Sequence, residues 1–360
     1  MGRVKDRRRA VVFAAAILIQ GCVALPANSP GDIVATVFDP WGSVGAVDGR
    51  VLFREYFCAI NEIQGPSLPD HRPCDDALRT IPPEAVPFPA HQVTHPSARP
   101  MTILVVPGFG HECFRNFIDG NGALVTFIES LGHSVHILDV RGLANSEENA
   151  EIIRDRFMQD PEIREADRIV MVGYSKGTND ILAALAHYPE IAERTDAVVS
   201  LSGAVAGSPL ALDAADWALG LLAALPGTDC EVPEDTALAS LYPSTRHQWL
   251  EENPLPKSVS YFSLVSYPDA EHISAILRPS FRALAKFDSR NDGQMIAIDQ
   301  VIPGSEVLAF LNADHLAVAL PIARLHQLLG STGINRNDFP IEVLLEAVFD
   351  YVDFRLQKRP

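Results

Sequence analysis

The feature that most restricts the fold of this chain is a regular alternation of apolar runs with segments of helical length. Mainly apolar runs cover residues 101–106, 134–140, 168–173, 196–201 and 259–265. Runs that lack a polar residue at every second position are typical of strands buried on both faces. Because such strands alternate here with helical segments, we expect crossover connections. The sequence therefore predicts an α/β fold with a mostly parallel central sheet flanked by helices.

Helical spacing fills the intervals between these runs. We expect helices over residues 119–131, 146–158, 177–188, near 271–287 and from about 341 to 356, with a short strand at 306–310. Residues 209–257 break the alternation. They are rich in Ala and Leu, then interrupted by prolines, and they hold two of the three tryptophans, Trp217 and Trp249. We interpret this segment as an inserted helical cap.

The motif Gly173-Tyr174-Ser175-Lys176-Gly177 lies between an apolar run and a predicted helix. A serine at such a junction must occupy a sharp, strained turn that lifts its hydroxyl out of the sheet. Glycine at both flanks leaves room for the crossing chain segments. The pattern alone is common, but its position between strand and helix predicts that Ser175 is a nucleophile.

A serine nucleophile needs a general base, and the chain has 11 histidines. In this type of strand–turn–helix arrangement the acid and then the histidine follow the serine along the chain. His315 comes just after the apolar stretch 306–311, whereas His326, the later alternative, falls within a predicted helical segment. The sequence therefore favours His315 as the base.

The acid of the triad is expected between Ser175 and His315. Asp292 stands in an Asn-Asp-Gly turn 23 residues before His315. A buried carboxylate at that point would orient the imidazole and stabilise its charged form. We favour Asp292 over four alternatives: Asp269, Asp288, Asp299 and Asp314. Asp269 follows the 259–265 run, and Asp314 is next to His315.

Two backbone N–H groups are needed to bind the oxyanion of an acyl-transfer intermediate. One is expected from Lys176, the residue after the nucleophile, and the other from a loop after an early strand. The sequence Pro107-Gly108-Phe109-Gly110 is that loop, and we assign the second N–H to Phe109. His111 and Glu112, which follow this loop, are expected near the site. A Ser–Lys dyad of Ser175 and Lys176 is disfavoured, because the side chains of neighbouring residues on a sharp turn diverge.

These motifs together resemble the α/β-hydrolase superfamily. The resemblance covers about residues 101–357, and the spacing from the Asn-Asp-Gly turn to His315 is similar to that of bacterial true lipases. It implies an α/β-hydrolase fold and a serine esterase or lipase that cleaves a small-molecule or lipid carboxylic ester without a cofactor. Where lipases carry a histidine before the oxyanion-loop glycine, this chain has Pro107.

Three alternatives stay open on the sequence. The same triad serves acyl transfer to an alcohol or sugar, and it serves peptidase or amidase chemistry. The third alternative is a non-catalytic, lipid-anchored binding protein that retains the fold. No metal site is predicted, because prolines near His91 and His95 exclude the helix that would align them as ligands.

The N-terminus has the features of an export signal. Residues 1–10 carry five basic side chains and one acidic one, and the apolar run 11–19 that follows is short for a membrane span. Ile19-Gln20-Gly21-Cys22 resembles the lipobox of bacterial lipoproteins. This resemblance implies a signal peptide over 1–21 and a lipid on Cys22, which would anchor the protein in the bacterial cell envelope.

Charge and cysteine content support the export hypothesis. The net charge of −17 disfavours nucleic acid as a partner, because an acidic body repels phosphates. Four further cysteines predict two disulfides in an exported chain: Cys58, Cys74, Cys113 and Cys230. We favour Cys58–Cys74, which flank a Pro-rich loop, and hence Cys113–Cys230. Residues 22–100 are expected to form a tether and an extended Pro-rich segment outside a domain that spans 101–360.

Overall fold

The fold is taken from a computed structural model that describes residues 45–82, 84, 99–114, 122–213 and 236–358. In these segments, eight strands form one sheet. Seven of them lie in the order β1-β8-β7-β6-β5-β3-β4, and the eighth, β2, also pairs with β8. Every neighbouring pair along the path is parallel, whereas β2 is antiparallel to β8. The strands are β1 (Val47–Asp48), β2 (Leu78–Arg79), β3 (Thr102–Val106), β4 (Ser134–Ile137), β5 (Ile169–Tyr174), β6 (Thr195–Leu201), β7 (Ser260–Ser266) and β8 (Glu306–Leu311).

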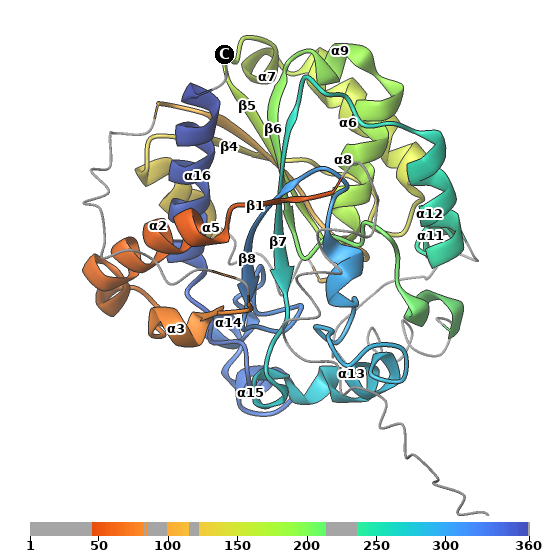
Figure 1. Ribbon diagram of the computed structural model, residues 1–360. Coiled ribbons are helices and arrows are strands. Elements are labelled where there is room, and N and C mark those ends of the chain that lie inside the picture. Colours follow the sequence, from red (N-terminus) through yellow and green to blue (C-terminus); the bar gives the residue numbers. More distant parts are fainter. Residues whose placement is uncertain (1–44, 83, 85–98, 115–121, 214–235, 359–360) are drawn as a thin grey trace, which may run out of the picture.

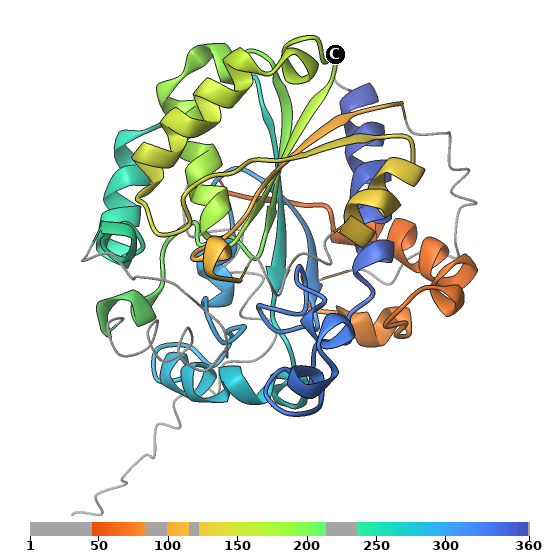
Figure 2. The same ribbon diagram turned by 180° about the vertical axis from the view of Figure 1, so that it is seen from behind.

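Helices cover both faces of the sheet (Figures 1 and 2). One layer contains α2 (Arg50–Ile63), α5 (Gly122–Ser130) and α16 (Ile341–Gln357). The opposite layer contains α6 (Ser146–Gln159), α7 (Pro161–Arg164), α8 (Lys176–His187), α9 (Pro189–Ala192) and α12 (Pro243–Glu252). Burial on both faces explains why the central strands are continuous apolar runs. The predicted α/β fold class, with a mostly parallel central sheet flanked by helices, is confirmed.

The carboxyl ends of the strands meet at one edge of the sheet. In Figure 1 this edge lies at the lower end of the view, near α13 (Arg278–Leu284), α14 (Ile322–Leu325) and α15 (Gln327–Ser331). Ligand sites of open parallel sheets occur at this edge. The loops that carry the predicted functional residues all begin here.

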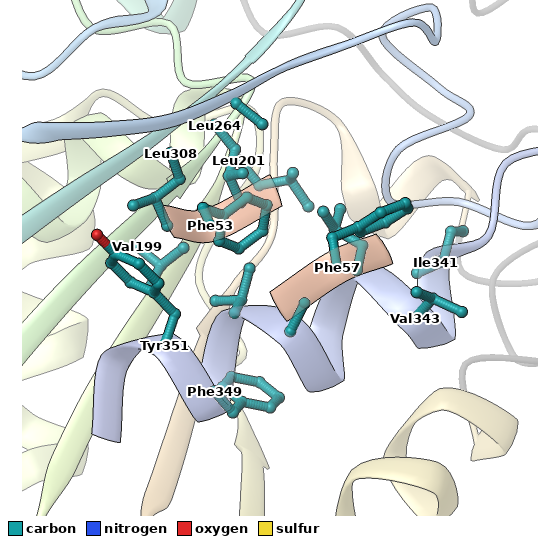
Figure 3. Packing of buried hydrophobic residues seen from close by; sticks show 14 of the residues in the cluster. Phe53, Phe57, Val199, Leu201, Leu264, Leu308, Ile341, Val343, Phe349 and Tyr351 are labelled. Carbon is teal, nitrogen blue, oxygen red and sulfur yellow. The ribbon is translucent and has the colours of Figure 1, made fainter. Parts of the chain in front are cut away.

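The described part of the N-terminal segment, which the sequence analysis placed outside the domain, packs into the same sheet and core. It contributes α2, α3 (Cys74–Ala77) and both short strands that pair with β8. Figure 3 shows Phe53 and Phe57 of α2 between the sheet and α16, and Tyr351 of α16 lies edge-on to Phe53 at 5.8 Å between ring centroids. Both phenylalanines are fully buried. Removing this segment would therefore expose one face of the core.

The favoured disulfide Cys58–Cys74 is present, with 5.3 Å between the two Cα atoms. It joins the end part of α2 to the start of α3, across the Pro-rich turn that the sequence indicated. The second predicted pair, Cys113–Cys230, lies outside the residues whose side chains the structure describes. The same is true of Cys22 and the predicted signal segment. No helix in the described ranges is long and apolar enough to cross a membrane.

The described part of the predicted cap differs from that prediction. It contains a 3₁₀ helix (Pro209–Asp213), α11 (Thr236–Ala239) and α12. Trp249 of α12 packs against the apolar cluster of α6 and α8, and its indole N–H donates to Glu147 at 2.9 Å. This helix therefore belongs to the flanking layer instead of covering the carboxyl edge of the sheet. Residues 214–235, including Trp217, lie outside the described ranges.

The helix predicted near 271–287 is shorter than expected. Two 3₁₀ turns (Ala270–His272 and Ala275–Leu277) come before α13, which has Pro279 in its first turn. Proline within a longer helix would lack an N–H and would clash with the preceding turn. The regular helix therefore starts only at Arg278. The resulting turns matter for the site, because the Ser274 N–H donates to the side chain of Asp314, next to His315.

Candidate active site

Ser175 lies on the sharp turn between β5 and α8, with a backbone φ of 53°. Non-glycine residues rarely adopt this conformation, and it costs roughly 1–3 kcal/mol. Both flanking glycines are required by close approach of the chain. A Cβ on Gly177 would lie 2.1 Å from the carbonyl oxygen of Val106, and one on Gly173 would lie 2.5 Å from the Cα of Thr178. The sequence motif therefore has the structural setting expected of a nucleophile elbow.

Three of the predicted residues form a continuous hydrogen-bonded row. Ser175 Oγ is 2.9 Å from His315 Nε2, and His315 Nδ1 is 2.7 Å from Asp292 Oδ2. Ser175 and His315 are each 5% exposed and Asp292 is fully buried. A buried carboxylate at this distance favours the tautomer with the proton on Nδ1, which leaves Nε2 free to accept the serine proton.

The Asn-Asp-Gly turn positions the carboxylate of Asp292 through its own backbone. Oδ1 of Asp292 accepts from the N–H groups of Gln294 at 2.8 Å and Met295 at 2.7 Å. The His315 N–H donates to the backbone carbonyl of Asp292 at 3.0 Å, so the two loops are joined directly. Gly293 has a φ of 91°, a conformation that glycine adopts without strain. Asp292 thus forms an Asx-type turn with one carboxylate oxygen and presents the other to His315.

Gln300 is a functional neighbour that the sequence did not indicate. Its side-chain amide donates to the carbonyl of Ser266 at 2.9 Å and to Asp292 Oδ2 at 3.3 Å, and it accepts from the Ser266 N–H at 2.7 Å. Gln300 therefore links the carboxylate of Asp292 to Ser266 at the end of β7, although Asp292 and Ser266 are distant in sequence. No local motif marks a glutamine for this role, because both partners come from other segments.

Tyr174 is a second residue that the sequence did not single out, although it lies within the motif. Its hydroxyl donates to the carbonyl of His315 at 2.8 Å, and the two rings lie 5.2 Å apart between centroids. Burial, together with the nearby carboxylates of Asp292 and Asp314, raises the pKa of Tyr174 well above its ordinary value. The neutral hydroxyl therefore remains a hydrogen-bond donor that fixes the loop carrying His315.

The four alternative aspartates have other partners or positions. Asp269 pairs with Arg79 at 3.1 Å, and Asp288 pairs with Arg290. Asp314 is fully buried, and its carboxylate accepts from the N–H groups of Ser274, Leu316 and Ala317. Burial raises the pKa of Asp314 to about 6 and that of Asp299 to about 7. Of the five candidates, Asp292 is the one in contact with His315. His326, the alternative base, stands at the junction of α14 and α15.

The predicted oxyanion loop lies beside the nucleophile. A Cβ on Gly108 would lie 3.0 Å from the Ser175 Cβ, so the backbone of this loop approaches the serine closely. The Phe109 side chain packs against a small apolar cluster with Ala204, Leu241 and Met295. This packing fixes the residue to which we assigned the second N–H.

The Lys176 side chain is bound to Asp180 and does not act as a base for Ser175 in this arrangement. Its ammonium is fully buried in an ion pair with Asp180, at 2.8 and 3.0 Å to the two carboxylate oxygens. The ion pair lies one turn along α8 from the motif. A Ser–Lys dyad therefore has no support in the structure, and the main-chain N–H of Lys176 is the group that remains at the elbow.

One group of potential metal ligands occurs among the described residues, consisting of His136, Asp160 and Glu162. The two carboxylate oxygens of Asp160 already accept from the Glu162 N–H at 3.0 Å and from Arg156 at 2.9 Å. His136 lies on the edge strand β4, Asp160 is the N-cap of α7, and Glu162 lies in the first turn of α7. His91 and His95 lie outside the described ranges.

Comparison with solved structures identifies close similarity to one esterase. The chain is 38% identical to the metagenomic carboxyl esterase MGS0156, with a TM-score of 0.76, covering 89% of this chain and 96% of that one. The mature form of the lipase BlEst2 from Bacillus licheniformis shares the fold, at 21% identity and a TM-score of 0.51 over 66% of this chain and 92% of that one. No family model matches the sequence, and no curated protein matches it. With 38% identity over nearly the whole of both chains, this protein belongs to the esterase and lipase family of α/β-hydrolases that includes the metagenomic carboxyl esterase.

Proposed function

We propose that this enzyme hydrolyses a carboxylic ester through a covalent intermediate on Ser175. The observation that carries the proposal is the row of contacts from Ser175 Oγ through His315 to the buried Asp292, at 2.9 and 2.7 Å. It is combined with the strained backbone of Ser175 at the end of β5. The similarity to a carboxyl esterase supports the same substrate class.

In the first half of the reaction, His315 Nε2 accepts the proton of Ser175 as Oγ attacks the ester carbonyl carbon. The carbonyl oxygen gains the negative charge and is held by the N–H groups of Phe109 and Lys176. The tetrahedral intermediate then collapses, and His315 returns the proton to the departing alcohol. Asp292 stabilises the imidazolium throughout without taking the proton itself.

In the second half, water takes the place of the alcohol. His315 removes a proton from the water, whose oxygen attacks the acyl-enzyme carbonyl, and Ser175 Oγ leaves with that proton. The products are a carboxylic acid and free enzyme. The scheme involves no oxidation or reduction, so it needs only the ester, water and residues that the chain supplies.

The decisive experiment labels the folded protein with a fluorophosphonate and locates the adduct by peptide mass spectrometry. We expect label on Ser175 and, in a parallel assay, release of p-nitrophenol from a short-chain p-nitrophenyl ester. Ser175→Ala should remove the label and lower kcat by about 10⁶-fold, as loss of a serine nucleophile does. Label at another residue, or turnover retained by the variant, would refute the proposal.

Ser202 provides a matched control. It is also a buried serine at positive φ, 50°, at the end of a central strand, but its Oγ lies 2.5 Å from Ser266 Oγ and not beside His315. Ser202→Ala should therefore retain both labelling at Ser175 and ester hydrolysis. Comparing an ester with the matching amide and with added alcohol acceptors then separates hydrolysis from peptidase or transferase activity.

A further inference from the structure

Between the two halves of the proposed oxyanion hole lies a polar chain that the hydrolytic scheme does not use. We propose that Glu112, Asn149 and Asp180 are positioning residues that hold the backbone N–H groups of Phe109 and Lys176 in a fixed relation. The inference rests on the proposed function, because it assigns a role to residues around the same oxyanion hole. The chain runs from the oxyanion loop through the β4–α6 loop, residues 138–145, to the first turn of α8.

The first link joins the oxyanion loop to the β4–α6 loop. The carboxylate of Glu112, three residues after Phe109, accepts from the N–H of Gly142 at 3.0 Å and from that of Leu143 at 3.2 Å. Two backbone donors on one carboxylate define both its position and its orientation, and such charge-assisted bonds are stronger than neutral ones. The loop that carries Phe109 is therefore tied directly to residues 142–143.

Gly142 shows how closely these two loops approach. A Cβ at this position would lie 2.6 Å from the backbone nitrogen of Gly110 and 2.8 Å from that of His111. Both distances are too short for a side chain, so residue 142 must be glycine for the loops to pack in this way. The backbone of the β4–α6 loop thus forms the surface against which the oxyanion loop rests.

The second link joins the β4–α6 loop to α8 through Asn149. This side chain accepts from the Arg141 N–H at 2.9 Å and donates to the Arg141 carbonyl at 2.9 Å, so it holds both polar groups of that residue. Its amide also donates to Asp180 Oδ2 at 2.8 Å. Asp180 in turn accepts from the ammonium of Lys176. Lys176 is the residue whose main-chain N–H forms the other half of the hole.

The burial of the second link, from Asn149 to Lys176, argues that its role is geometric. Asn149 and Lys176 have no exposed surface, and Asp180 is 1% exposed. A buried ion pair gains little stability over apolar side chains of similar size, because both charges lose their water. It does fix direction, since each hydrogen bond is satisfied in one arrangement only. A transition state that places charge on one oxygen needs donors fixed in this manner before reaction.

The test compares three variants with the wild type: Glu112→Gln, Asn149→Ala and Asp180→Asn. The two N–H groups donate to different oxygens of Glu112, so in the glutamine variant the side-chain NH₂ would face one of them and that hydrogen bond would be lost. The Glu112 variant therefore loosens the first link at a partly exposed position. The control is Asp353→Asn. Asp353 is also a buried aspartate, 2% exposed, and its ion pair with Arg168 at 2.6 Å lies at the opposite end of β5.

The readouts are kcat and KM for a p-nitrophenyl ester, the inhibition constant of a trifluoromethyl ketone, and the pH profile. The ketone forms an oxyanion adduct with Ser175, so its affinity reports the hole and does not depend on the fraction of folded enzyme. We expect kcat to fall about 10- to 100-fold, less than the 10²- to 10³-fold cost of losing a whole donor. Ketone affinity should fall in proportion, with KM within about twofold of the wild type. The pH profile should stay unchanged, because His315 and Asp292 are not altered.

Each outcome decides the matter. If Asp180→Asn does not fold, Glu112→Gln alone provides the comparison, because its side chain is 31% exposed. Variants that match Asp353→Asn in kcat and ketone affinity would overturn the positioning role while the wild type remains an esterase. A shifted pH profile would instead place the effect on the histidine and overturn it as well. A wild type that neither cleaves the ester nor binds the ketone would overturn the proposed function and this inference together.

Discussion

At the scale of single residues, the proposed acid, Asp292, is held by more hydrogen bonds than the proposed base, His315. Asp292 receives hydrogen bonds from two backbone N–H groups and from Gln300 in addition to its contact with His315. These donors orient the carboxylate oxygen that faces the imidazole. His315 is fixed mainly through its backbone, by Asp292 and Tyr174.

Replacing Asp292 by Asn should therefore lower kcat about 10⁴-fold while the fold remains intact. The asparagine oxygen still accepts from the turn N–H groups, but its amide would donate to Nδ1 and favour the wrong tautomer of His315. Steady-state kinetics and circular dichroism measure the two effects. Asp269→Asn, three residues after the end of β7, should retain most activity, and equal losses in the two variants would contradict the assignment.

Asp299 gives a prediction for pH-dependent stability. Burial and the charge of Asp288 raise its pKa from 3.8 to about 7. A carboxyl group with a higher pKa in the folded state favours folding while it is protonated, and that contribution is lost as the pH rises from about 4 through about 7. Asp299→Asn should increase the free energy of unfolding by about 4 kcal/mol at pH 8, since the pKa difference is about three units at about 1.4 kcal/mol each, and change it little at pH 4. Urea denaturation at both pH values tests this, and an equal effect at both would exclude ionisation as its cause.

At the scale of secondary-structure elements, the N-terminal segment is attached to the rest of the domain at several points. Arg72 donates to the carbonyl of Asn312 at 2.9 Å, and the Asn312 N–H donates to the carbonyl of Ala77 at 2.8 Å. Asn312 lies three residues before His315. The segment that precedes the predicted domain boundary therefore supports the end of β8 from which the loop of the base begins.

The disulfide Cys58–Cys74 is expected to stabilise this attachment. Its two cysteines are 16 residues apart, and a cross-link over about 15 residues contributes about 3 kcal/mol in the chain-entropy account. The double variant Cys58→Ser and Cys74→Ser should lose about that much stability in urea denaturation. Reduction of the wild type by dithiothreitol provides the matched comparison. An unchanged midpoint in both would show that α2 and α3 are held by packing alone.

At the scale of the whole molecule, the described domain presents its candidate active site at the carboxyl edge of the sheet, while residues 1–44 lie outside the described ranges. We propose from the sequence that Cys22 carries a lipid that tethers this domain to the cell envelope. Expression in a bacterial host with labelled palmitate should label the wild type and not Cys22→Ala. Intact mass spectrometry should also show cleavage before residue 22. A labelled alanine variant, or an intact N-terminus, would contradict the lipoprotein hypothesis.

The sequence by itself determined the order of strands and helices in the main part of the domain and the elbow around Ser175. These are local signals, because a buried strand and a strained turn each impose their pattern on neighbouring residues. The position of His315 and the turn at Asp292 also followed from residue types and chain order. Their contacts are present in the structure, and their catalytic roles stay predictions.

Only the tertiary structure decided which distant residues complete the site and the sheet. The two-residue strands β1 and β2 are too short for any periodic signal, so their pairing with β8 depends on the packing of α2. Gln300 meets Asp292, and Asn149 meets Asp180, because the fold brings separate loops to one edge. α12 lies in the flanking layer because Trp249 packs against the apolar cluster of α6 and α8 and donates a hydrogen bond to Glu147. Such partnerships carry no local pattern, since each side chain is satisfied by a residue remote in sequence.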